Sequence, residues 1–381
     1  MRVALKGLNA TRWVLVAVTL APGEINQEHR LQSTVLVIGA GASAELHFPV
    51  GTGLASRIST TSRISFDAAR HSEFPQNAEF FSIAQAALAK FRKYSGDAAV
   101  ALEKMRQLSL GVQLASSIDN YLHLHQSDEA LVMLGKLAIA YEIAGLEQGS
   151  ALAEFRQDGT RRSSALPMDT WHISFFRAVT EQCPLIELPE RFKAVTIISF
   201  NYDRVFEKFL LRAIMEQYNT DESAAAAAMK PLVIYHPYGS LGRLKTEDPV
   251  GGWPYGERLF TDNVIKMAGA IRTFTEGMEA NDVQQHTVGE RLRSADRTVF
   301  LGFGFLPANM KLLDSLIGDK KGMVPYGRFA YGTCFKASIY NERHYKEALA
   351  KLLHIGPEYV ELKDLECRDF FPYFLEGLRF V

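Results

Sequence analysis

The sequence predicts an α/β protein built on a doubly wound, mainly parallel, Rossmann-like sheet with a helical insertion. Three observations predict this fold. Short runs of apolar, mostly β-branched residues recur along the chain, as is typical of parallel strands that helices cover on both faces. Helical patterns lie between these runs. One long interval contains helical patterns but no clear strand.

The strand and helix patterns alternate. The predicted strands are 34–38, 195–200, 232–235, 298–303, 328–335 and 358–362. Between them, 204–217 and 309–317 have the apolar spacing of helices, and 221–230, with its five alanines, is expected to be a helical or flexible spacer. Because strands and helices alternate, we expect a doubly wound sheet.

One interval, 74–187, breaks this alternation. Its clearest helical patterns are 80–94 and 130–146. We therefore predict one α/β domain formed by 30–73 and 188–381, with 74–187 as a helical insertion or lid and 1–29 as an N-terminal extension.

The composition is that of an ordinary globular protein. Of 381 residues, 47% are hydrophobic, and 42 Lys and Arg nearly balance 43 Asp and Glu, so direct binding of nucleic acid is not expected. Cys183, Cys334 and Cys367 stand far apart without a CxxC pair, which argues against a disulfide framework and a cysteine zinc site. We expect buried thiols in a reducing, cytoplasmic compartment.

The N-terminal residues imitate a secretory signal. Arg2, Lys6 and Arg12 precede the apolar run 13–21, but no clear small-x-small cleavage site precedes Pro22. We expect an extension or a first strand there. No run reaches the ~20 apolar residues of a membrane span, so no membrane association is expected.

A glycine-rich run, Gly-Ala-Gly-Ala-Ser at 39–43, directly follows the first predicted strand. Glycines there allow a tight turn and let backbone N–H groups approach a phosphate. With Ala44 the run also fits the GxGxxA fingerprint of dehydrogenases, which requires a second strand ending in an acid about 20 residues later. The segment 59–67 is polar and is not expected to form that strand, so hydride transfer loses its main support. A turn without a ligand is the alternative.

Three further predicted strands end in polar or glycine residues. Asn201 and Asp203 follow the first of these strands, and His236 follows the second. Gly302 and Gly304, with Asn309 after them, stand at the end of the third. Each has a structural alternative: helix capping, a hydrogen-bonded loop histidine, and close packing. Because parallel strands bring their carboxyl ends to one edge, where a dinucleotide crevice forms, we expect these residues to surround one ligand.

The ordered motifs resemble those of a known superfamily. GAGAS (39–43), FNYD (200–203), His-x-x-Gly-Ser-Leu (236–241) and LGFGF (301–305) with Asn309 look like the motifs of sirtuins, and more closely of the SIR2-like NADases of bacterial anti-phage defence. The stretch around Ile118, Asp119 and Leu122 resembles another element of such proteins. An equally good interpretation of this stretch is a helix that carries one acid on its face and buries one leucine.

The resemblance implies a sirtuin-like domain that takes NAD⁺ as its substrate and cleaves the nicotinamide–ribose bond. Asn201 would be catalytic, orienting a water molecule or the ribose, and His236 would be the general base. Asp203 would hold the nicotinamide carboxamide. The other implied NAD⁺-binding residues are Gly39, Ala40, Gly41 and Ser43 at the pyrophosphate and ribose, and Gly302 and Gly304 at the adenosine half. Asn309 is implied to bind NAD⁺ as well.

Departures from the protein deacylases limit the resemblance. The zinc-binding cysteine quartet is absent, the loop at 48–51 is Phe-Pro-Val-Gly where deacylases have Pro-Asp-Phe-Arg, and Pro237 and Tyr238 separate the histidine from its glycine. We therefore expect no zinc and favour NAD⁺ hydrolysis over deacylation. A catalytically silent nucleotide-binding scaffold is the third interpretation.

Control of such an activity is also expected, since free NAD⁺ hydrolysis would starve the cell. The last predicted strand leaves only about a score of residues after it, so we expect no separate sensor module and place the control in oligomer assembly, in 74–187 acting as a lid, or in a partner protein. We expect a homo-oligomer, and the resemblance implies a HerA-type ATPase as a possible partner.

Overall fold

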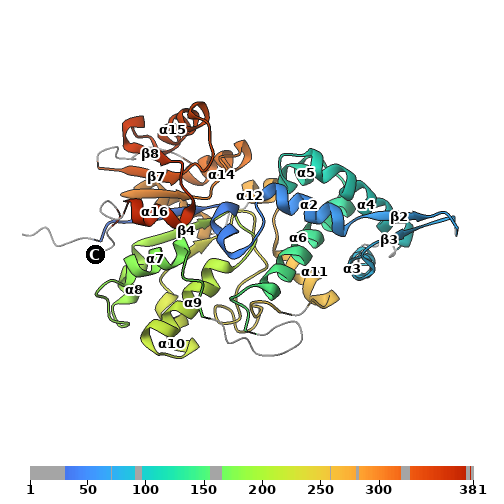
Figure 1. Cartoon of the computed structure of the whole chain (residues 1–381), viewed down its shortest axis with the longest axis horizontal. Helices are drawn as coiled ribbons and strands as arrows, with labels where there is room; N and C mark the ends of the chain where they lie inside the picture. Colours follow the sequence, from blue (N-terminus) through green and yellow to red (C-terminus); the bar gives the residue numbers. More distant parts are fainter. Residues whose placement is uncertain are drawn as a thin grey trace, which may run out of the picture. The chain divides into compact units, whose positions relative to one another are not determined.

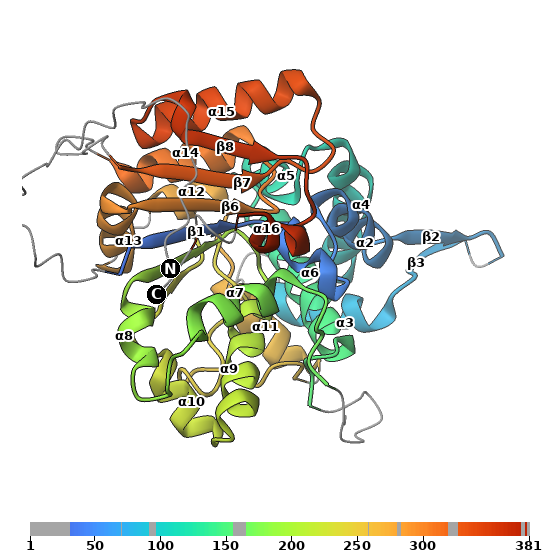
Figure 2. The same ribbon diagram turned by 60° about the vertical axis from the view of Figure 1, so that its left-hand side comes forward.

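The computed structural model describes residues 31–69, 71–90, 97–154, 165–257, 259–279, 283–318, 327–374 and 378. The predicted extension 1–29 lies outside the described residues. Six strands form one parallel sheet in the order β5-β4-β1-β6-β7-β8. They are β1 (Thr34–Ile38), β4 (Val195–Ser199), β5 (Val233–Tyr235), β6 (Arg297–Leu301), β7 (Phe329–Thr333) and β8 (Val360–Lys363). Figure 2 shows β1, β6, β7 and β8 of this sheet side by side. Counted within this sheet alone, the order is 3-2-1-4-5-6, that of the Rossmann fold. The predicted α/β class is confirmed.

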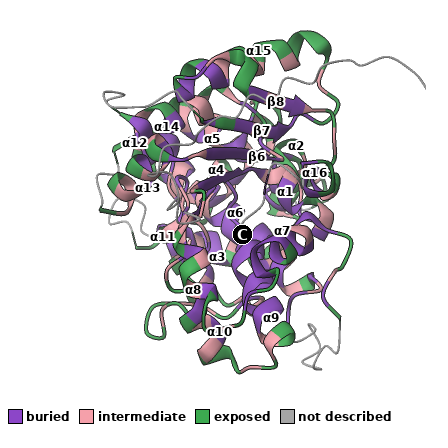
Figure 3. Ribbon diagram, turned by 90° about the vertical axis from the view of Figure 1, so that its left-hand side faces the viewer, coloured by how far each residue is buried: buried purple, intermediate pink, exposed green. Residues whose placement is uncertain are grey.

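The central strands are buried on both faces, which explains why they are mostly apolar. Every residue of β1, β4 and β6 is buried, and β6 is purple in Figure 3. A side chain binds the backbone of the edge strand β5. The Gln284 amide donates a hydrogen bond to the Ile234 carbonyl at 2.7 Å.

Helices cover both faces of the sheet (Figure 1). Right-handed crossovers place the helices that lead toward β5 on one face and those that lead toward β8 on the other. The first group is α7 (Trp171–Thr180), α8 (Leu188–Lys193), α9 (Val205–Tyr218) and α10 (Glu222–Met229), joined by α16 (Cys367–Phe374). The second is α12 (Phe274–Glu279), α13 (Val283–Ser294), α14 (Pro307–Ile317) and α15 (Ile339–Leu353). Short helices are α1 (Ala40–Ser43), η1 (Ala44–Leu46), η2 (Val112–Leu114) and η3 (Pro357–Tyr359).

A second body of helices packs beside the carboxyl edge of the sheet (Figure 1). It consists of α2 (Gly51–Thr61), α3 (Ala78–Leu88), α4 (Ala98–Gly111), α5 (Ile118–Leu124), α6 (Glu129–Gly149) and α11 (Thr261–Ala270). Side-chain oxygens of Asn77, Asp97, Ser117 and Asp128 accept backbone N–H groups at the starts of α3 to α6. This body is the structural counterpart of the predicted insertion 74–187.

The structure changes three details of the sequence prediction. The segment 59–67, expected to form no strand, contains β2 (Ile64–Asp67), which pairs antiparallel with β3 (Ser72–Pro75) in a hairpin outside the main sheet. The helical body also begins earlier, at α2, and gains α11, whereas α7 packs with α9 and α16 of the α/β core. The spacer 221–230 is the helix α10, capped by Asp221.

Among the described helices, not one has the length and hydropathy needed to cross a bilayer.

A buried ion pair joins the helical body to the α/β core. Arg204, just before α9, donates through Nη2 to Glu147 Oε2 at 2.5 Å and through Nε to Oε1 at 3.1 Å. The two side chains are 1% and 0% exposed. Arg204 also donates to the carbonyls of Trp253 and Pro254 at 3.0 and 3.2 Å. One guanidinium thus holds α6, α9 and the 253–254 loop together.

Candidate active site

A cavity of about 700 Å³ lies at the carboxyl ends of β1, β4, β6 and β7. Its volume is within the range of small-molecule sites, and it lies where the strand order reverses beside β1, the place where doubly wound sheets bind nucleotides. The predicted site residues that line it are Gly39, Ala40, Gly41, Asn201, Asp203, Gly302, Gly304 and Asn309. Ser43 and His236 are not part of its lining.

The glycines let the loops after β1 and β6 touch. A Cβ on Gly39 or Gly41 would lie 2.7 to 2.8 Å from the backbone of Gly302, too close for any side chain. Gly302 itself has φ +56°, which favours glycine. The Gly39 and Gly41 amides donate to the carbonyls of Leu301 and Gly302 at 3.0 and 3.1 Å. These two N–H groups therefore join the loops, and close packing explains the glycines without a phosphate.

Ser43 lies beneath the cavity and links the two polar residues of the FNYD turn. Asn201 Nδ2 donates to Ser43 Oγ at 3.0 Å, and Ser43 Oγ donates to Asp203 Oδ1 at 3.1 Å. All three residues are buried. Asn201 Oδ1 is also buried and has no hydrogen-bond partner among the residues that the structure describes. Such an orphaned acceptor costs about 1–3 kcal/mol, so it calls for a functional explanation.

Asp203 combines a structural contact with an unusual charge state. Its Oδ1 accepts the Val205 N–H at 3.1 Å, two residues on, whereas the N-cap residue of α9 is Arg204, whose side chain makes no cap hydrogen bond. Burial raises the pKa of Asp203 to about 7, and the Glu207 and Glu147 carboxylates act in the same direction. The side chain therefore titrates near neutral pH, where it can either accept or donate a hydrogen bond to a ligand.

Asp203→Asn is expected to stabilise the protein at alkaline pH. Between about pH 4 and 7 the folded chain keeps a proton that the unfolded chain releases, so this group makes the free energy of unfolding fall as pH rises. The shift of about three pKa units corresponds to roughly 4 kcal/mol at most. At pH 8 the free energy of unfolding, measured in urea, should be higher for the variant than for wild type. At pH 4 the two free energies should be nearly equal. An equal difference at both values would contradict this.

The helical body contributes Asp119 to the same cavity. Asp119 stands in the first turn of α5, and its Oδ1 accepts a hydrogen bond from the Tyr202 hydroxyl. Burial raises the pKa of Asp119 to about 6, with the Tyr202 hydrogen bond opposing that rise. Of the sequence motif around Ile118 and Leu122, Asp119 is therefore the residue whose side chain contributes to the site.

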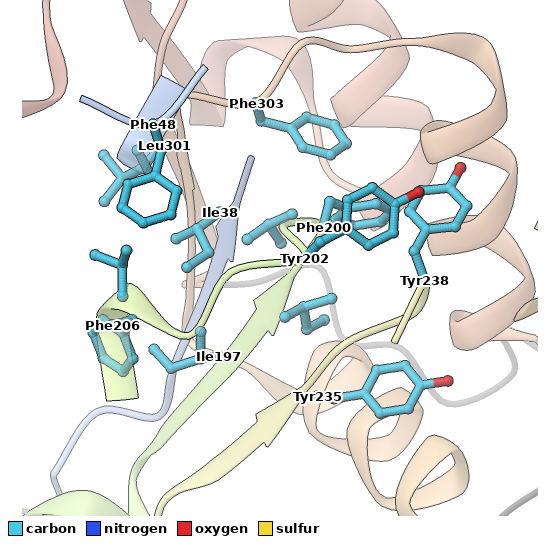
Figure 4. Close-up of a cluster of buried hydrophobic side chains, with 14 of the residues drawn as sticks. Ile38, Phe48, Ile197, Phe200, Tyr202, Phe206, Tyr235, Tyr238, Leu301 and Phe303 are labelled. Carbon is cyan, nitrogen blue, oxygen red and sulfur yellow. The ribbon is translucent and has the colours of Figure 1, made fainter. Parts of the chain in front are cut away.

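Aromatic rings form one wall of the cavity. Figure 4 shows Phe200, Tyr202, Tyr238 and Phe303, which belong to this wall. Phe200 meets Tyr238 and Phe303 edge-on, with ring centroids 5.8 and 5.1 Å apart. The Tyr238 hydroxyl donates to Asn309 Oδ1 at 2.9 Å, which fixes the Asn309 amide. This wall is apolar, as in most nucleotide and cofactor pockets.

His236 lies on the other side of the FNYD turn. It lines a separate cavity of about 1180 Å³, its Nδ1 is 2.9 Å from the Asn201 carbonyl oxygen, and its Nε2 is 2.8 Å from Glu207 Oε1. Since both partners are acceptors, both ring nitrogens carry protons. Burial disfavours this cation, but Glu207 outweighs burial and raises the pKa of His236. The structure does not bring His236 to the cavity that Asn201 lines.

Sequence reasoning missed several residues of the cavity. Glu45 lies two residues after Ser43; its Oε2 accepts the Trp171 N–H at 2.9 Å, and its Oε1 is buried without a partner in the described part of the chain. Lys336 and Arg368 line the cavity beyond β7 and β8. The rule that ligands bind at the carboxyl edge would have pointed to these two.

Within the described ranges, no cluster of three or more metal-ligating side chains occurs. The expectation of no zinc stays a prediction, which elemental analysis tests. A comparison with family models and one with curated proteins gave no match to this chain.

Proposed function

We propose that this protein binds NAD⁺ and hydrolyses its nicotinamide–ribose bond, releasing nicotinamide and ADP-ribose. The observation that carries the proposal is the chain of hydrogen bonds Asn201–Ser43–Asp203 under a cavity at the reversal point of a Rossmann-type sheet. The orphaned Asn201 oxygen supports it, because a hydroxyl of a bound ligand would give that oxygen a partner.

The charges around the cavity suit this reaction. Nicotinamide is a cation in NAD⁺ and leaves as a neutral molecule, so no group has to protonate it. The positive charge moves to the ribose, and the carboxylates of Asp119 and Asp203 line the cavity on the β4 side, where they would stabilise that charge. The chain needs to position the substrate, stabilise the charged sugar and deliver water.

In this proposal Asn201 orients the ribose or the attacking water, and Asp203 holds the carboxamide. His236 acts differently from the general base implied by the resemblance. Its Nδ1–H fixes the Asn201 carbonyl, and its second N–H is bound to Glu207. We therefore propose that His236 positions the catalytic turn from behind.

The test is incubation of the purified protein with NAD⁺, with products separated by chromatography and binding measured by calorimetry. Release of nicotinamide and ADP-ribose supports the proposal. Binding without release would favour a silent nucleotide-binding scaffold. NAD⁺-dependent loss of acyl groups from lysine peptides would favour a deacylase.

Depletion of NAD⁺ in anti-phage defence, and control by assembly, extend the proposal. Leu110, Leu114 and Leu124 of the helical body are exposed, and subunit interfaces bury such side chains. We propose a homo-oligomer whose activity depends on a second component, such as a HerA-type ATPase. Light scattering, with NAD⁺ hydrolysis assays with and without that component, tests this. A monomer fully active alone would contradict it.

A further inference from the structure

The start of α5 is held rigidly at the cavity. Ser117 caps the helix by accepting the Asn120 N–H at 3.1 Å. Leu122 packs against Gly135 of α6, where a Cβ would lie 2.3 Å from the leucine. Tyr121 donates to the Gln107 carbonyl at 2.9 Å. The position of the Asp119 backbone is therefore fixed by three separate contacts with α4, α6 and its own cap.

The carboxylate of Asp119 faces the cavity with one oxygen available. Tyr202 donates to Oδ1, whereas Oδ2 makes no side-chain hydrogen bond with the residues that the structure describes. Tyr202 stands between Asn201 and Asp203 in the chain, so its hydroxyl sets the distance of Asp119 from the turn that holds the proposed substrate. A carboxylate with one oxygen fixed by a hydrogen bond and the other oxygen available is suited to taking a proton from water.

The other candidate bases are placed differently. His236 lies in the neighbouring cavity, with both ring nitrogens bound. Asp203 accepts from Ser43 and from Val205 N–H, both through Oδ1, and in the proposed function it already holds the carboxamide. Glu45 accepts from Trp171 N–H through Oε2, and its other oxygen is buried, whereas Glu366, beyond β8, accepts from Arg368 Nε at 2.9 Å. Asp119 is the carboxylate on the β4 side of the cavity that has an oxygen without a side-chain partner among the described residues and no other role in the proposed function.

We propose that Asp119, delivered by the helical body, is the general base of the reaction. The water oxygen forms a bond to the ribose carbon as the bond from that carbon to nicotinamide breaks. The electron pair of the broken bond goes to the pyridine nitrogen, and the proton of the water goes to Asp119, which later releases it to solvent. This inference rests on the proposed NAD⁺ hydrolysis and adds the residue that activates the water.

Asp119→Asn should lower the turnover number by roughly 10²–10⁴-fold, the usual share of a general base, while NAD⁺ affinity by calorimetry stays close to that of wild type. Azide attacks without losing a proton. It should therefore restore nicotinamide release by Asp119→Ala and yield azido-ADP-ribose, identified by mass spectrometry. Asn120→Ala, one residue along the same helix, is the control and should retain full turnover.

Tyr202→Phe tests the same role without removing the acid. The titratable groups coupled to Asp119 are Tyr202 and Tyr238, and Asp203 lines the same cavity. Because burial raises the pKa of Asp119 to about 6 and the Tyr202 hydrogen bond holds it there, loss of the hydroxyl should move the acid limb of the pH–rate profile to higher pH.

The outcomes are distinguishable. Full turnover by Asp119→Asn, no rescue by azide, or an unmoved acid limb in Tyr202→Phe overturns the role of Asp119 and leaves NAD⁺ hydrolysis standing. Failure of the wild type to release nicotinamide refutes the proposed function and the role of Asp119 with it.

Discussion

Replacement of Asn201 by alanine is expected to reduce NAD⁺ cleavage roughly 10³-fold while the protein stays folded. Asn201 is the buried residue of the FNYD turn whose amide points to Ser43 and whose oxygen has no partner among the described residues. The variant loses one hydrogen bond but also an unpaired oxygen, so the free energy of unfolding should change by only about 1 kcal/mol. Nicotinamide release and urea unfolding measure the two quantities.

A matched control separates the site from its surroundings. Asn263 lies on α11, outside the lining of the cavity, and Asn263→Ala should turn over NAD⁺ at the wild-type rate. Wild-type turnover by Asn201→Ala would remove Asn201 from the mechanism. A large loss of stability in that variant would assign the residue a structural role.

Glu147→Ala is expected to lower the free energy of unfolding by about 3–5 kcal/mol. The substitution leaves the Arg204 guanidinium, 1% exposed, without its counter-ion in the interior. Arg204 keeps its bonds to the Trp253 and Pro254 carbonyls, which do not neutralise its charge. Urea unfolding followed by circular dichroism measures the loss.

The exposed pair Arg343–Glu347 on α15 provides the comparison. Its side chains are 82% and 58% exposed, and Glu347→Ala should change stability by less than about 0.5 kcal/mol because solvent screens such pairs. Equal effects of the two substitutions would show that the Arg204–Glu147 pair does not join the helical body to the core.

The fold could be predicted from the sequence because its determinants are local. β1, β4 and β6 are mostly apolar and are buried at every position, as in a sheet that is covered on both faces. Parallel strands then place the residues that follow them at one edge, which is why Asn201, Asp203 and Gly302 were expected together.

The remaining features depend on tertiary contacts that no local pattern encodes. Asp119 reaches the site because Leu122 and Tyr121 seat α5 on α6 and α4, and Glu147 meets Arg204 across 57 positions of sequence. The direction of His236 follows from its bond with Glu207. The β2–β3 hairpin was missed since its strands are short and partly polar.

The FNYD turn and the arginine after it alternate in their partners. Asn201 and Asp203 bind Ser43 beside β1, whereas Tyr202 and Arg204 bind Asp119 and Glu147 of the helical body. The turn thus sends successive side chains to different partners, so one short segment contacts both halves. The two halves therefore depend on each other physically: without the helices, the Arg204 charge would lose its counter-ion and the Tyr202 hydroxyl would lose its acceptor.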